Sequence, residues 1–222
     1  RNLSGGEILS QVLNINRMVK VSTIVIMGSG EPLANYENVL RFIKLCHESY
    51  CLNLSYRSIT LSTCGLVPGI YRLASEGIPL TLSVSLHAPN DEIRNQLMPV
   101  NKRYPIAAVI AASQYYAAKT GRRVTYEYIL IAGLNDQPEH ARELASILKG
   151  QLANVNLIPF NPVSERALSK PRNEVIMLFQ QILRQHGVNT VIRREMGSDI
   201  QAACGQLRNK VLTDETCQKG GL

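Results

Sequence analysis

One cysteine near the carboxyl end of the sequence, Cys204, has surroundings suited to a chemically active thiol. It stands in the run 202–207, Ala-Ala-Cys-Gly-Gln-Leu, shortly after the charged turn 196–200. Small residues on both sides leave the sulfur approachable and let the backbone bend. A cysteine kept only for packing needs neither property, and such a small buried hydrophobe is the alternative here. Cys204 is therefore a candidate for a thiol that must meet a bulky partner.

A glycine-rich run, 28–32 (Gly-Ser-Gly-Glu-Pro), directly follows an apolar run. Its glycines let the backbone come close to a ligand, and Glu31 could anchor an ammonium group there. A plain strand-to-helix turn is the alternative. The run does not complete the G-x-G-x-x-G fingerprint of dinucleotide sites, because Leu33 stands where the third glycine would be.

Two further polar residues, His87 and Asn161, stand at the ends of predicted strands. His87 could act as an acid or a base, or it could be a hydrogen-bonded loop histidine. Asn161 is followed by a proline, which presents its amide rigidly; the amide can both donate and accept, as a nucleobase or ribose edge requires. An Asx turn is the alternative for Asn161. His47, His140 and His186 fall on predicted helices without a ligand partner at i+4, and we expect them to be solvated.

The composition favours an anionic partner and a reducing compartment. The net charge is +7 with a pI of about 9.3, and nucleic acid is the commonest partner of such a protein. The five cysteines form neither a regular framework nor a C-x-x-C pair, which fits a cytoplasmic protein without disulfides. No apolar run reaches the ~18 residues that span a bilayer, so we expect no membrane partner.

The apolar periodicity alternates between helix and strand along the whole chain. A helix capped by Ser4 and Glu7 is followed by predicted helices at 37–47, 69–75, 106–120, 138–149 and 173–186, and strands are predicted at 23–27, 58–63, 80–86, 123–131, 155–159 and 190–193. Repeated β-α units imply a parallel sheet, which can form a full or partial (β/α) barrel or an open doubly wound sheet. The continuous apolar run 23–27 suits a strand buried on both faces. The carboxyl ends of parallel strands lie along one edge of the sheet or barrel, which we call the rim. Polar residues at several of these strand ends predict that a polar ligand binds at the rim.

These segments together resemble the radical S-adenosylmethionine (SAM) enzymes that methylate C2 of an adenine in the large ribosomal RNA and that also act on transfer RNA. The resemblance covers residues 1 to about 207. The matching runs are 1–3, 27–33, 61–63, 85–91, 99–101, 156–162 and 199–207. It implies a partial TIM-like (β/α) barrel over 1–207, followed by a tail at 208–222, with the first strand and the cluster-binding loop lying upstream of Arg1.

By this resemblance Gly30 and Glu31 hold the methionine end of SAM. Ser62, Ser85, Leu86, His87 and Asn161 line the rest of its site, and Cys204 is the methyl carrier. In the family, one SAM methylates the cysteine thiolate. A second SAM is cleaved by one electron from a [4Fe-4S] cluster, and the radical formed on the S-methyl group adds to the adenine. A base and a second cysteine then release the product.

The sequence departs from the family pattern in one respect: it lacks the C-x-x-x-C-x-x-C loop that holds the cluster. We therefore expect this chain alone to bind no cluster and to be inactive. The alternatives are a related C8-adenine methyltransferase that confers antibiotic resistance, and a non-catalytic RNA-binding remnant. The resemblance further implies 23S rRNA and tRNA as substrates and an electron donor such as flavodoxin or ferredoxin. We also expect a monomer.

Overall fold

The computed structural model describes residues 1–27, 29–161 and 168–193. Six parallel strands in this part of the chain form one sheet, and neighbours in sequence are neighbours in the sheet. The strands are β1 (Ile24–Ile26), β2 (Ile59–Thr63), β3 (Thr81–Ser85), β4 (Val124–Leu130), β5 (Ala153–Pro159) and β6 (Asn189–Ile192). They agree with the predicted strands to within two residues at each end.

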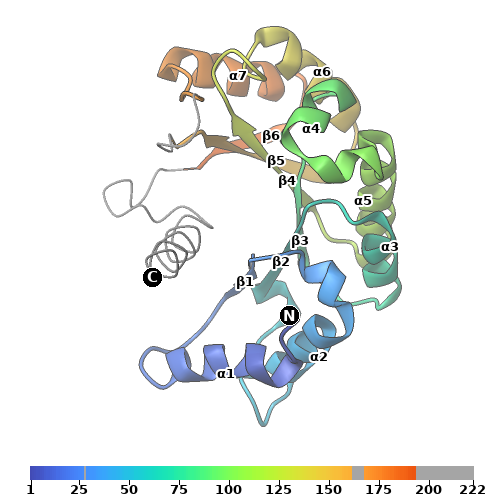
Figure 1. Cartoon of the computed structure of the whole chain (residues 1–222), viewed down its shortest axis with the longest axis vertical. Coiled ribbons are helices and arrows are strands. Elements are labelled where there is room, and N and C mark those ends of the chain that lie inside the picture. The colour runs from blue at the N-terminus through green and yellow to red at the C-terminus, as the bar shows by residue number, and fades with distance from the viewer. Residues whose placement is uncertain (28, 162–167, 194–222) are drawn as a thin grey trace, which may run out of the picture.

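Helix α1 (Gly5–Asn16) precedes β1, and the other helices connect successive strands along the outer side of the curved sheet (Figure 1). They are α2 (Tyr36–His47), α3 (Val67–Ser75), α4 (Asp91–Leu97), α5 (Ile106–Thr120), α6 (Pro138–Leu148) and α7 (Asn173–Gln185), with short 3-10 helices η1 (Pro32–Asn35), η2 (Tyr56–Ser58) and η3 (Pro99–Lys102). A doubly wound sheet would reverse its strand order and carry helices on both faces. The expected partial barrel is therefore confirmed, and the doubly wound alternative is excluded.

The two faces of the sheet differ in polarity. The helix-covered face is apolar, and Leu82 and Tyr126 on it are almost fully buried. On the concave face the strand register sets Ser62 beside Ser83 and Ser85 beside Glu127. The expectation that 23–27 is buried on both faces is wrong: Val25 is 55% exposed, because β1 is an edge strand whose concave face no described segment covers.

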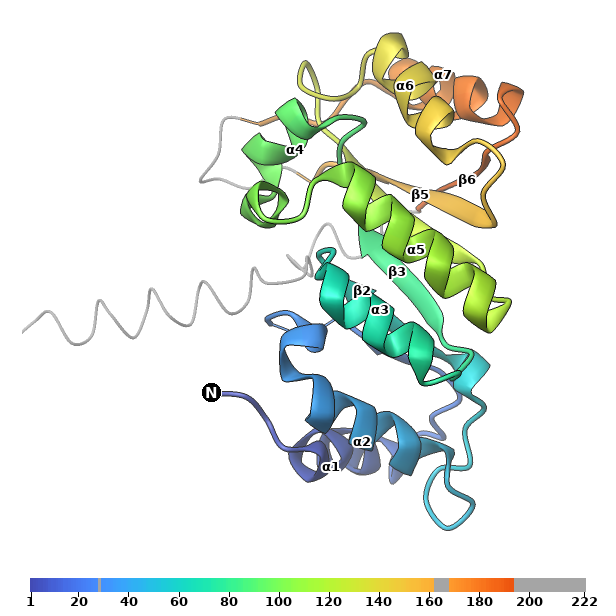
Figure 2. The same cartoon turned by 90° about the vertical axis from the view of Figure 1, so that its right-hand side faces the viewer.

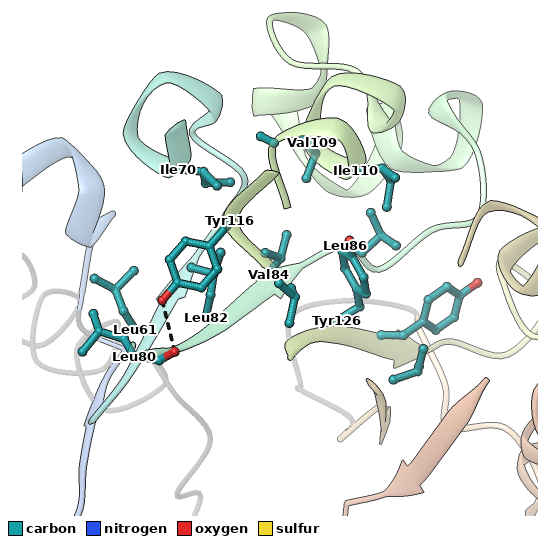
Figure 3. Close-up of a cluster of buried hydrophobic side chains, with 14 of the residues drawn as sticks. Leu61, Ile70, Leu80, Leu82, Val84, Leu86, Val109, Ile110, Tyr116 and Tyr126 are labelled. Carbon is teal, nitrogen blue, oxygen red and sulfur yellow. Dashed lines mark hydrogen bonds between the residues drawn. The ribbon is translucent and has the colours of Figure 1, made fainter. Parts of the chain in front are cut away.

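The core lies between the sheet and its outer helices (Figure 3). Ile70 of α3 and Val109 of α5 pack over the apolar side chains of β2 and β3, and α3 and α5 pack side by side (Figure 2). Tyr116 of α5 is fully buried, and its hydroxyl donates to the Leu80 carbonyl at 3.1 Å. This contact ties the carboxyl-terminal part of α5 to the start of β3.

The sequence pattern predicted helix α1 but missed helix α4. The capping box of α1 is present, with the Glu7 N–H donating to the Ser4 hydroxyl and the Ser4 N–H donating to the Glu7 carboxylate. Helix α4 was not predicted, because it is short and buries a charged residue, Arg94, where an apolar one would mark a helix.

Among the described residues, no helix is both long and apolar enough to cross a membrane.

His47 is exposed, as expected, although its ring also makes local contacts. Its Nδ1 lies 2.8 Å from the Leu54 carbonyl oxygen, and its ring stacks on Tyr56 with a centroid separation of 4.0 Å. The other two helix histidines make local contacts: His140 caps α6 and His186 contacts a carbonyl of its own helix.

Candidate functional site

Glu31 lies on the rim formed by the carboxyl ends of the parallel strands, in the loop after β1. It is the N-cap of η1, and its Oε1 accepts the Leu33 N–H at 3.0 Å. Its Oε2 accepts the Cys64 N–H at 2.7 Å, which joins this loop to the end of β2. Gly30, immediately before it, has a φ of +125°, a conformation open to glycine and strained for other residues. A carboxylate can accept about four hydrogen bonds, so the two from Leu33 and Cys64 leave capacity for further donors.

Cys64 belongs to the same group through its thiol as well as its backbone. Burial, and after it the hydrogen bond and negative charge of Glu31, raises the pKa of the thiol to about 12. The thiol therefore stays protonated at neutral pH and donates to the carboxylate. Sequence reasoning assigned Cys64 no role, because its contact with Glu31 spans 33 residues of chain.

Ser62 and Ser85 place hydroxyl groups on the concave face at the ends of β2 and β3. Within the described residues, neither hydroxyl makes a hydrogen bond to another protein group. Ser83 differs, because its hydroxyl donates to the buried Glu127 carboxylate at 2.8 Å. The Asn156 amide occupies the other carboxylate oxygen of Glu127, also at 2.8 Å. The serines at the rim are thus available to a ligand, whereas Glu127 is satisfied by the sheet itself.

His87 is held in one orientation and one protonation state. Its φ of +60° is unusual for a residue other than glycine. Its Nδ1 accepts the Ile129 N–H at 3.2 Å, so the proton of the neutral ring lies on Nε2. Burial, and after it the positive charge of Arg94, lowers the pKa of His87 to about 4. The structure thus favours the hydrogen-bonded loop histidine, a neutral ring with one N–H donor, over an acid or base.

Asn135, which sequence reasoning missed, fixes the backbone of His87. Its buried amide nitrogen donates to the His87 carbonyl at 2.8 Å and to the Ile129 carbonyl at 2.7 Å, and its oxygen accepts the Ile131 N–H at 2.8 Å. The carbonyl of Glu127 accepts the His87 N–H at 3.1 Å. Strand β4 and the loop after it therefore set the conformation of the loop after β3.

The remaining predicted site residues divide into three cases. Leu86 has a fully buried side chain that belongs to the core rather than to the rim. Asn161 lies two residues after the end of β5 and is half-buried, and the N–H of the preceding Phe160 donates to the Leu130 carbonyl at the end of β4. Cys204 lies outside the described residues, as does the proposed boundary at 207.

A cavity of about 480 Å³ lies along the open edge of β1. Gly30 and Glu31 line it at the carboxyl end of the strand, together with Val25 and residues of α1. Among the described residues, no group of three or more His, Cys, Asp or Glu side chains could hold a metal ion. This part of the chain therefore offers a site for an organic ligand and no cluster ligands.

Comparisons with known proteins show the family and the fold of this chain. Residues 1–145 match the family model described as the radical SAM superfamily. A curated protein of Symbiobacterium thermophilum, named "Probable dual-specificity RNA methyltransferase RlmN", is 56% identical over 215 residues, which are 95% of this chain and 58% of the relative. The protein of Desulforudis audaxviator with the same name is 52% identical over 95% of this chain and 67% of its own length.

A solved structure of high similarity is that of a radical SAM methyltransferase from Sphaerobacter thermophilus. The TM-score is 0.89 at 48% sequence identity, and the match covers 93% of this chain and 62% of that chain. The chain therefore spans about three fifths of the length of the proteins that it matches.

Proposed function

We propose, since the chain belongs to the radical SAM superfamily and within it to the RlmN-type methyltransferases, that the whole protein methylates C2 of an adenine in 23S rRNA and in tRNA. The observation that supports this most directly is the rim itself: Glu31, Ser62, Ser85 and His87 lie at the carboxyl ends of three neighbouring parallel strands, and a hydrogen bond from the Cys64 N–H to Glu31 joins the first two ends.

The rim residues fit the chemistry of SAM. The methionine end of SAM carries an ammonium group, which can donate to the lone pair that the Glu31 carboxylate keeps after its three hydrogen bonds within the protein. Ser62 and Ser85 offer hydroxyls, and neutral His87 offers one N–H donor to the polar groups of the nucleoside. Asn161 extends the same rim beyond β5. When bound, SAM supplies both a methyl group and a carbon radical.

Cys204 is the proposed methyl carrier. A thiolate accepts a methyl group from a sulfonium readily, whereas the C2–H of adenine is neither acidic nor nucleophilic enough to do so. A second thiol near SAM would compete for this methyl group. The raised pKa of Cys64 keeps that thiol protonated and therefore a poor nucleophile.

The described residues do not fit a [4Fe-4S] cluster, and we derive no step through one. We propose that the cluster ligands, the base and the second cysteine belong to parts of the whole protein beyond this chain. We also propose a barrel domain at 1–207 with a tail at 208–222, an electron donor such as flavodoxin or ferredoxin, and a monomer in the cytoplasm.

The proposed function is tested on RNA. The full-length protein is expressed in a host that lacks its own adenine-C2 methyltransferase, and digested 23S rRNA and tRNA are analysed by mass spectrometry. We expect 2-methyladenosine in both RNAs and its loss in the Cys204→Ala variant. Detection of 8-methyladenosine alone would favour the C8 enzyme. RNA binding without either product would favour a binding remnant.

Replacement of the carboxylate tests the SAM anchor separately. Glu31→Gln should weaken SAM binding by about 1.5–3 kcal/mol, because one charge-assisted hydrogen bond is lost. Isothermal titration calorimetry on the full-length protein measures the effect. Glu37→Gln is the matched control, since Glu37 is an exposed carboxylate that pairs with Arg72 on the outer helices. Equal affinity of Glu31→Gln and wild type would remove Glu31 from the SAM site.

A further inference from the structure

Arg94 of α4 is fully buried, and all five of its N–H groups are used. Its Nε donates to the Leu86 carbonyl at 3.1 Å. Nη1 donates to the Asn101 side-chain oxygen at 2.8 Å and the Tyr104 carbonyl at 3.2 Å. Nη2 donates to the Cys64 carbonyl at 2.8 Å and the Ser85 carbonyl at 3.2 Å. One guanidinium thus joins the ends of β2 and β3 to η3 and the residues after it.

This burial is unusual because Arg94 has no ion-pair partner among the described residues. Burial lowers the pKa of the guanidinium, but an arginine stays protonated in a protein. Burying an unpaired charge is costly, and an apolar side chain would pack the same space at lower cost. The saturated donor set indicates instead that Arg94 is needed for the backbone carbonyls it collects.

Three of the four carbonyls that Arg94 holds, those of Cys64, Ser85 and Leu86, belong to the segments that carry the proposed SAM site. The Cys64 N–H donates to the Glu31 carboxylate, and the carbonyl of the same residue accepts from Arg94. Ser85 and Leu86 lead directly into His87. Gly65 makes room for the guanidinium, since a Cβ there would lie 3.1 Å from Nη2.

We propose that Arg94 is a positioning residue for SAM binding: its five hydrogen bonds fix the Glu31 loop and the His87 loop relative to each other. This rests on the proposed function. A lysine would keep the charge, but its ammonium group has three donors and lacks the planar five-donor geometry of a guanidinium, so it cannot reproduce the contacts. A glutamine would lose both.

The first measurement is SAM affinity of the full-length protein by calorimetry. Arg94→Lys and Arg94→Gln should each bind SAM at least about tenfold more weakly, equivalent to about 1.4 kcal/mol. Arg122 provides the matched control because it is a partly buried arginine at the opposite ends of the strands, where it donates to the Thr81 hydroxyl. Arg122→Lys should bind SAM as the wild type does.

The second measurement is the pKa of His87, obtained by NMR titration without SAM. The His87 pKa should rise in Arg94→Gln and stay low in Arg94→Lys, because only the former removes the charge. A role confined to stability would lower the melting temperature and leave both the SAM affinity and the His87 pKa unchanged. That outcome would overturn the proposal.

Failure of the proposed function can be distinguished from failure of the positioning role. A wild-type protein that does not bind SAM refutes the proposed function, whereas tight binding by Arg94→Lys refutes the positioning role alone. The His87 titration tests the charge in either case. If the Arg94 variants do not fold, Asn101→Ala removes one acceptor of Nη1 and leaves the four carbonyls. It should weaken SAM binding by several-fold, and unchanged affinity would count against the proposal.

Discussion

The neutral state of His87 makes a definite prediction for stability in acid. The pKa of His87 is lowered from 6.5 to about 4, so the unfolded chain binds a proton more readily than the folded chain does between these values. The stabilisation from the neutral ring is therefore complete above about pH 6.5 and is lost as the pH falls towards 4. A pKa difference of one unit between the folded and unfolded states corresponds to about 1.36 kcal/mol of stability. The expected loss at about pH 4 is thus about 3 kcal/mol.

The assay compares urea unfolding of the 222-residue chain at about pH 7 and about pH 4 with that of His87→Asn. Asparagine tolerates the positive φ of this position, and its amide oxygen can accept the Ile129 N–H, but it cannot be protonated. The carboxylates titrate in both proteins, so their effect cancels in the comparison. On acidification the free energy of unfolding of the variant should therefore fall by about 3 kcal/mol less than that of the wild type. His186→Asn serves as the control at a histidine that contacts its own helix. Equal acid sensitivity of His87→Asn and wild type would refute the reasoning.

Two packing predictions concern the elements that support the rim. Gly69→Ala should destabilise the chain by about 1–3 kcal/mol in urea unfolding, because a Cβ there would lie 2.8 Å from the Cβ of Leu33. Gly6→Ala should leave stability unchanged or raise it, because a Cβ at Gly6 would have no neighbouring atom within 4 Å. Destabilisation of the chain by both substitutions would contradict the packing argument. Tyr116→Phe should cost about 1 kcal/mol because the Leu80 carbonyl loses a buried donor; unchanged unfolding would mean that the hydrogen bond contributes nothing.

The order of elements and the identity of the rim residues followed from the sequence. Apolar periodicity located the strands, and the parallel β-α-β rule places all their carboxyl ends on one edge, so Glu31, Ser62 and His87 were expected together. The Ser4 capping box was equally local. These predictions depend on residues a few positions apart or on a general rule of topology, and neither requires knowledge of distant contacts.

The electrostatic state of the site depended on contacts that no local pattern reveals. Arg94 meets Cys64 across 30 residues of chain, and His87 meets Ile129 across 42. A charged residue within a short helix is ordinarily exposed, so the sequence pattern alone gave no indication that Arg94 is buried. The open face of β1 was likewise hidden, since the run 23–27 is apolar on both sides. The sequence by itself determined which groups reach the rim. Only the tertiary structure decided their hydrogen-bond partners and hence their protonation, because burial and neighbouring charge are properties of the folded chain.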